Sequence, residues 1–145
     1  MSEMGCEPAA GGGSTRATAE PGRYCIIVDD DPGICKALSF TLRKVGFETL
    51  DVAGPTALEA ALAVRLPNLI FLDLGLGESG AMDVLPILAR CEYEGFVQLM
   101  SGRSQQVIDE VAAAGTQQGL RMLPALPKPF RMGVIKDLVA SFDRA

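Results

Sequence analysis

Apolar residues along this chain form short continuous runs that alternate with stretches of helical spacing. Four of the runs have the length and apolarity of strands buried on both faces of a sheet: 24–28, 68–72, 96–100 and 120–126. A weaker run at 47–52 supplies a fifth strand. Strands that alternate with helical segments are typical of an α/β domain, so the pattern predicts a sheet with helices on both faces.

The segments between and after these runs carry apolar residues at helical spacing, which marks one buried face on each predicted helix. Five such segments are expected, at 34–45, 56–64, 81–91, 107–112 and 135–142. Strands and helices therefore make five βα units, and no internal repeat is visible.

Residues 1–22 differ from the rest in composition. They are rich in small and polar residues, include the run Gly11-Gly12-Gly13, and lack apolar periodicity, so we expect a disordered N-terminal tail. The whole chain has 145 residues, of which 48% are hydrophobic, enough for one compact domain and too few for two. That domain is predicted at 23–145.

The charge and the residue types of the chain narrow the range of possible functions. Thirteen basic and eighteen acidic residues give a net charge of -5 without a basic cluster, which argues against nucleic-acid binding. No apolar stretch approaches the roughly 20 residues that cross a bilayer, and no signal peptide is recognisable, so a cytoplasmic protein without membrane contact is expected. The chain has no histidine, so any histidine in its chemistry must come from a partner.

Polar residues follow the predicted core strands at the points where each strand ends. Asp29 and Asp30 come after the first, Asp73 after the third, Ser101 after the fourth and Lys128 after the last. Because parallel strands share one carboxyl edge, where ligands bind, these side chains should meet in one pocket. Carboxylate oxygens without cysteine or histidine favour Mg²⁺, with Mn²⁺ as the alternative, over zinc.

Two local patterns support this pocket. Asp31 and Pro32 suit the N-cap and first position of the first helix, which accounts for one aspartate of the acidic run. Lys128 lies between Pro127 and Pro129, and two prolines stiffen the backbone that aims its ammonium group. A hydroxyl at Ser101 could donate to a phosphoryl oxygen in the same pocket.

Taken together, the motifs resemble the receiver domain of bacterial two-component response regulators over roughly 23–145. They occur in this order: Val28-Asp29-Asp30-Asp31-Pro32, Leu72-Asp73-Leu74 with Gly80 further on, Met100-Ser101-Gly102, and Lys128-Pro129-Phe130. The resemblance implies a CheY-like, flavodoxin-like fold, with a five-stranded parallel sheet in the order 2-1-3-4-5 and five flanking helices.

The resemblance also implies a chemistry. Asp73 would accept a phosphoryl group from a sensor histidine kinase or histidine phosphotransfer protein. Mg²⁺ would be held by Asp30, Asp73 and the Gly75 carbonyl, with Asp29 reaching it through water, while Lys128 balances the remaining charge. Ser101 would then move toward the phosphoryl group. The expected protein is a single-domain response regulator, a phosphoacceptor rather than an enzyme, that signals to a downstream protein the sequence does not identify.

Several positions depart from the family. Ala125 occupies the place of a switch aromatic, and Gly75 and Arg103 offer no carboxylate or amide to position a hydrolytic water. The stretch before Lys128 is also long, and we expect the additional residues at 112–119. Self-association into a homodimer stays open.

Two other functions remain alternatives. One is a receiver-like binding module that works without phosphorylation. The other is a magnesium phosphohydrolase with an aspartate nucleophile, although such enzymes need a second aspartate two residues on, where this chain has Gly75.

Overall fold

The structure is a computed structural model that describes residues 23–76, 78–102, 105–128 and 130–143. The predicted tail at 1–22 and Arg103 lie outside the described residues. The elements follow one another as β1 (Tyr24–Val28), α2 (Pro32–Lys44), β2 (Glu48–Val52), α3 (Pro55–Val64), β3 (Leu69–Asp73), the 3₁₀ turn η2 (Leu74–Leu76), α4 (Glu78–Arg90), β4 (Phe96–Ser101), α5 (Gln105–Gln117), β5 (Arg121–Pro127) and α6 (Met132–Asp143).

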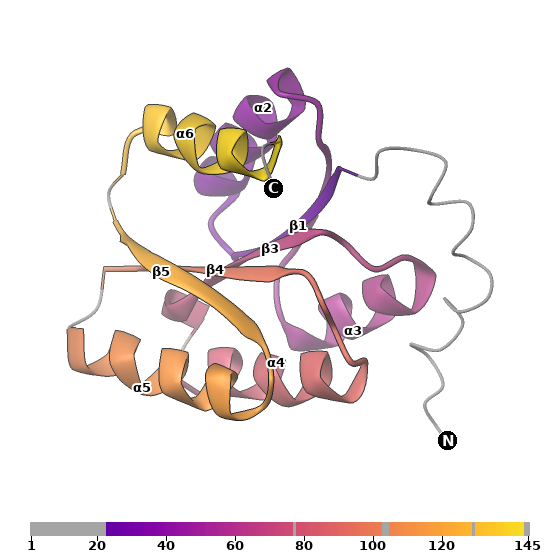
Figure 1. Cartoon of the computed structure of the whole chain (residues 1–145), viewed down its shortest axis with the longest axis vertical. Coiled ribbons are helices and arrows are strands. Elements are labelled where there is room, and N and C mark those ends of the chain that lie inside the picture. Colours follow the sequence, from indigo (N-terminus) through magenta and orange to yellow (C-terminus); the bar gives the residue numbers. More distant parts are fainter. Residues whose placement is uncertain (1–22, 77, 103–104, 129, 144–145) are drawn as a thin grey trace.

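The five strands form one parallel sheet in the order β2-β1-β3-β4-β5. Helices α2 and α6 cover one side, called here the α2/α6 face, while α3, α4 and α5 cover the other, the α3–α5 face (Figure 1). The predicted fold and strand order are confirmed. Among the described residues, each helix is too short or too polar to span a bilayer.

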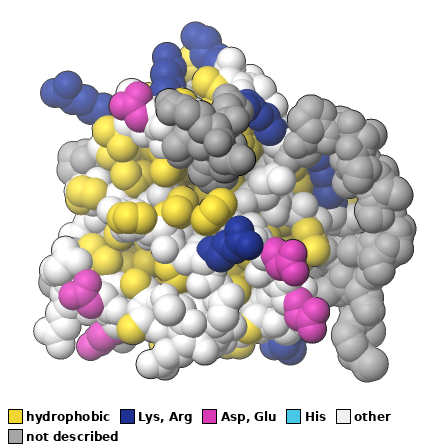
Figure 2. Space-filling model, in the orientation of Figure 1, with side chains coloured by type: hydrophobic (Ala, Val, Ile, Leu, Met, Phe, Trp, Pro, Cys, Tyr) yellow, Lys and Arg dark blue, Asp and Glu magenta, His cyan; other side chains and the backbone are white. Residues whose placement is uncertain are grey.

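Burial explains the apolar runs that mark the strands. Every residue of β1 and β3, the two inner strands beside the site, is buried, because helices cover both faces of the sheet. In the edge strand β2 only Val52 is buried, which accounts for the weaker sequence signal of this strand. Hydrophobic side chains also gather on the surface where β5, the other edge strand, runs (Figure 2).

The start of α2 fixes the position of the acidic turn at 29–31. Asp31 is its N-cap, with Oδ1 accepting from the backbone N–H groups of Gly33 at 2.9 Å and Ile34 at 3.3 Å. Pro32 is the first helical residue, where a missing N–H has no cost. The predicted cap is confirmed, and it leaves the side chains of Asp29 and Asp30 for other roles.

The segment between Ser101 and Lys128 contains an irregularity that the sequence did not indicate. Helix α5 ends at Gln117 and a turn with Gly119 at a φ of +87° follows, within the region where additional length was expected. The pairing of β4 with β5 also shifts register between Gln98 and Met100. Part of the additional chain is therefore inside β5 itself.

Candidate functional site

Three carboxylates meet at the carboxyl edge of the sheet. Asp29 follows β1, Asp30 is next to it, and Asp73 ends β3. Each of them offers an oxygen atom within 4.8 Å of the others. Asp29 and Asp73 are only 3% and 4% exposed, whereas Asp30 faces solvent. Of the three carboxylates, Asp30 is therefore the one that solvent reaches most readily.

Lys128 closes the site from the β5 side. Its Nζ donates to Asp73 Oδ1 at 2.9 Å and to Asp29 Oδ2 at 3.2 Å. The backbone N–H of Lys128 donates to the carbonyl of Ser101 at 2.9 Å, which ties the end of β5 to the end of β4. One ammonium thus contacts both buried carboxylates, as the positions at the strand ends predict.

Backbone N–H groups also hold the two buried carboxylates. Asp29 Oδ1 accepts from the N–H of Asp31 at 2.9 Å, and Asp73 Oδ1 accepts from the N–H of Gly75 at 3.0 Å. A Cβ on Gly75 would lie 3.0 Å from Asp73 Oδ2, so a side chain there would crowd the carboxylate. The Gly75 carbonyl as a metal ligand stays a prediction.

Ser101 reaches the same edge from β4. It is 2% exposed and lies opposite Pro127 in the β4–β5 pairing. This position beside Lys128 is the one expected from the sequence, and the role of its hydroxyl stays a prediction.

Comparisons with known proteins show which family has this architecture. No family model matches the chain. The nitrogen assimilation regulatory protein NtrX of Azorhizobium caulinodans is 32% identical over 107 residues, which cover 72% of this chain and 22% of that protein. The beryllofluoride-activated NtrC receiver domain is 25% identical with a TM-score of 0.62, over 83% of this chain and 91% of that one. This chain is a response-regulator receiver domain.

A further solved structure agrees in fold with this receiver. A response regulator from Colwellia psychrerythraea has a TM-score of 0.73 at 22% identity, over 86% of this chain and 99% of that one. The receiver spans less than a third of the length of the first curated relatives that it matches. The likeness therefore concerns one domain of those longer proteins.

Charge and burial shift the pKa values in the receiver's site. Burial raises the pKa of Asp29, and the negative charge of Asp73 adds to this, while the N–H of Asp31 and the ammonium of Lys128 oppose it. Burial disfavours the charged form of Lys128, but its hydrogen bond and attraction to Asp73, and then Asp29, outweigh this and raise its pKa. The lysine therefore stays protonated at neutral pH.

The pKa of Asp29 leads to a prediction for the metal-free receiver. A folded-state pKa above the ordinary value of 3.8 means that ionisation of Asp29 is less favourable in the folded chain, so its contribution to stability falls as pH rises through that pKa. Asp29→Asn removes the ionisation. In the presence of a metal chelator, we expect Asp29→Asn to unfold at a higher temperature than the wild type at pH 7, and the difference to shrink toward pH 3.

Thermal unfolding followed by circular dichroism at the two pH values measures this effect. The exposed Asp83→Asn on α4 is the matched control, and it should shift the midpoint little at either pH. A midpoint of Asp29→Asn equal to or below that of the wild type at pH 7 would contradict the raised pKa.

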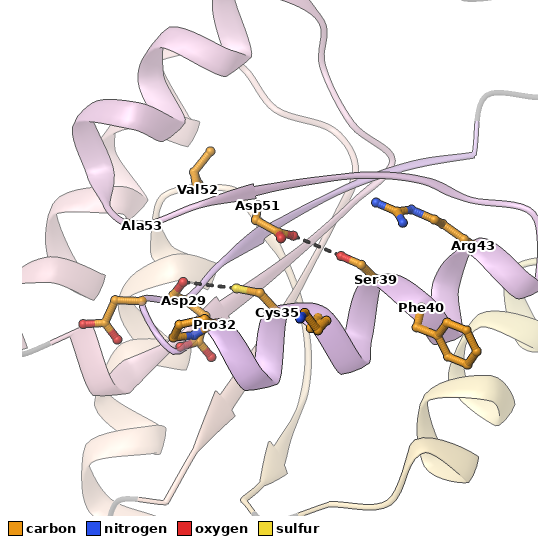
Figure 3. Close-up of a pocket in the computed structure, with 11 residues that line it drawn as sticks. Asp29, Pro32, Cys35, Ser39, Phe40, Arg43, Asp51, Val52 and Ala53 are labelled. Atoms are coloured by element: carbon orange, nitrogen blue, oxygen red, sulfur yellow. Dashed lines mark hydrogen bonds between the residues drawn. The ribbon is translucent and has the colours of Figure 1, made fainter.

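A groove that the sequence did not reveal adjoins the acidic turn. It has a volume of about 620 Å³ and lies between α2 and the end of β2 (Figure 3). Ser39 donates to Asp51 across it at 3.1 Å, and the Cys35 thiol donates to the Asp29 carbonyl at 3.2 Å. Burial raises the pKa of Cys35 to about 11, so this thiol stays protonated at neutral pH. The small residues Cys35 and Ser39, one turn apart on α2, were the available signal.

Proposed function

We propose that this receiver accepts a phosphoryl group on Asp73 in a magnesium-dependent reaction and serves signal transduction or a phosphorelay. The observation that carries the proposal is the bridge from Lys128 Nζ to both Asp73 and Asp29 beside a third carboxylate. An acceptor aspartate needs a nearby fixed cation and a place for a metal, because charge accumulates on the phosphoryl oxygens.

The charges of the site suit a divalent cation. Three carboxylates and one ammonium give the ionised cluster a net charge of -2, so one doubly charged ion would neutralise it. Oxygen donors alone are the ligands that magnesium prefers. Asp29, Asp30 and Asp73 would hold the ion, with the Gly75 carbonyl as the further ligand, and the ion would offset the developing phosphoryl charge. Mn²⁺ offers the same chemistry.

The phosphoryl transfer itself would use three side chains of this chain, those of Asp73, Lys128 and Ser101. A carboxylate oxygen of Asp73 attacks the phosphorus of a phosphohistidine, the new P–O bond forms as the P–N bond breaks, and the imidazole leaves and takes up a proton. Lys128 would donate to a phosphoryl oxygen. The Ser101 hydroxyl would donate to another once the group is attached.

The donor histidine must lie outside the 145 residues of this chain, because they contain none. We infer a sensor histidine kinase or a histidine phosphotransfer protein as donor and a downstream protein as target, in the cytoplasm. The receiver acts as a phosphoacceptor whose only reactions are its own phosphorylation and dephosphorylation.

Incubation with phosphoramidate and Mg²⁺ tests this function. Intact-mass measurement should find one phosphoryl group per chain, and chelation of the metal should abolish the reaction. Rapid phosphate release over many turnovers would favour the phosphohydrolase instead, and no labelling at saturating Mg²⁺ would favour a phosphorylation-independent binding module.

A further inference from the structure

The alternation of side chains along β5 reverses in the middle of the strand. Leu123 and Leu126 pack on the α2/α6 face, while Met122 and Ala125 pack on the α3–α5 face. In a regular strand, residues two apart share a face, so Leu123 and Ala125 should lie on the same side, yet they lie on opposite sides. Pro124, between them, is exposed.

The strand pairing gives the cause of this reversal. Gln98 pairs with Leu123 and Met100 pairs with Leu126. One residue of β4 therefore opposes two residues of β5, Pro124 and Ala125, which is the definition of a β-bulge. Proline cannot donate a hydrogen bond to the strand pairing because it has no N–H. It is tolerated in a bulge because the additional residue there is left unpaired.

The bulge decides where Lys128 emerges. Leu126 is on the α2/α6 face, so Lys128, two residues on, leaves β5 toward that face. Phe71 is on the same face, and Asp73 follows it by two residues. Without the additional residue the phase of β5 would be inverted beyond Leu123, and Lys128 would be directed away from Asp73.

The side chain of Gln98 holds the bulge. Gln98 is 1% exposed, and its Nε2 donates to the carbonyl of Pro124 at 2.7 Å and to that of Leu99 at 3.1 Å. The adjoining β4 residues on this face, Phe96 and Met100, are apolar. A buried amide among apolar neighbours is costly unless it is hydrogen-bonded, and here its bonds go to the bulge.

We propose that Gln98 is a positioning residue of the phosphoacceptor site, whose amide fixes the bulge at Pro124 and thereby the face of the sheet on which Lys128 emerges. The consequence for phosphorylation rests on the proposed function of Asp73. The consequence for the backbone does not, because the bond from the Lys128 N–H to the Ser101 carbonyl reports the register directly.

The test compares Gln98→Met with Val97→Ala. Methionine has a similar length without the amide, while Val97 is a buried neighbour on β4 that packs on the α3–α5 face. We expect Gln98→Met to slow phosphorylation by phosphoramidate about tenfold or more at saturating Mg²⁺, and to speed hydrogen exchange at the Lys128 amide to a similar degree. Val97→Ala should change both by much less at an equal or larger loss of unfolding midpoint.

Each outcome decides the proposal. Equal rates and equal Lys128 exchange in the two variants would overturn it, and so would faster exchange without slower phosphorylation. Should Gln98→Met fail to fold, Gln98→Asn, which withdraws the amide from Pro124 by one methylene, provides the same comparison. An unphosphorylated wild type would refute the proposed function alone, since the exchange comparison would still show whether Gln98 sets the register.

Discussion

Replacing Asp73 by asparagine should abolish phosphorylation of this receiver by phosphoramidate. The amide is not a nucleophile toward phosphorus at neutral pH, and the other carboxylates of the site have different positions, since Asp29 is held by Lys128 and the Asp31 N–H. Asparagine keeps an oxygen for the N–H of Gly75, so the fold should persist. Intact-mass measurement should therefore find a folded chain without a phosphoryl adduct.

The exposed Asp83→Asn on α4 is the control for this experiment and should be labelled like the wild type. Labelling that is undiminished in Asp73→Asn would remove Asp73 as the acceptor. Partial labelling that disappears only when Asp29 is also replaced would assign the reaction to a different carboxylate.

Lys128→Met should have the second largest effect. The substitution keeps most of the side-chain length and removes the only ammonium found on Asp73 and Asp29 among the described residues. Loss of one preorganised donor to the reacting oxygens costs about 100-fold or more in rate. We expect a loss of this size in the initial rate of phosphorylation at saturating Mg²⁺.

A measurement of Mg²⁺ affinity distinguishes a role of Lys128 in the reaction from a simple disruption of the fold. The lysine and a metal ion compete for the same carboxylates, so Lys128→Met should bind Mg²⁺ at least as tightly as the wild type. Lys136→Met, an exposed substitution on α6, should leave both rate and affinity unchanged. Weaker Mg²⁺ binding in Lys128→Met would show that the lysine supports the site rather than the reaction.

The sequence predicted the fold because its strands differ strongly from their surroundings. The inner strands β1 and β3 are buried throughout, so they appear as continuous apolar runs, and a polar residue at the end of such a run indicates the sheet edge. This is why Asp29, Asp73 and Lys128 could be grouped across about a hundred residues. The strand order came from the resemblance of the motifs, not from the hydrophobic pattern.

The phase of β5 could not be predicted in this way. The segment around Pro124 is apolar at almost every position, so it has no polar alternation that would reveal a change of face. The residue that fixes the bulge, Gln98, belongs to another strand, and a lone glutamine in an apolar run gives no indication of its partner. Register that depends on a side chain 26 residues away appears only once the strands are paired.

The prolines of β5 affect how another protein can bind at this edge of the sheet. An outermost strand normally presents a row of unpaired backbone donors and acceptors, onto which a foreign strand can add. In β5 both Pro124 and Pro127 are exposed and lack the N–H, so two of its seven residues have no backbone donor to offer an added strand. Addition of a further strand to β5 is therefore disfavoured. A partner that binds at this edge has to recognise side chains instead of the main chain.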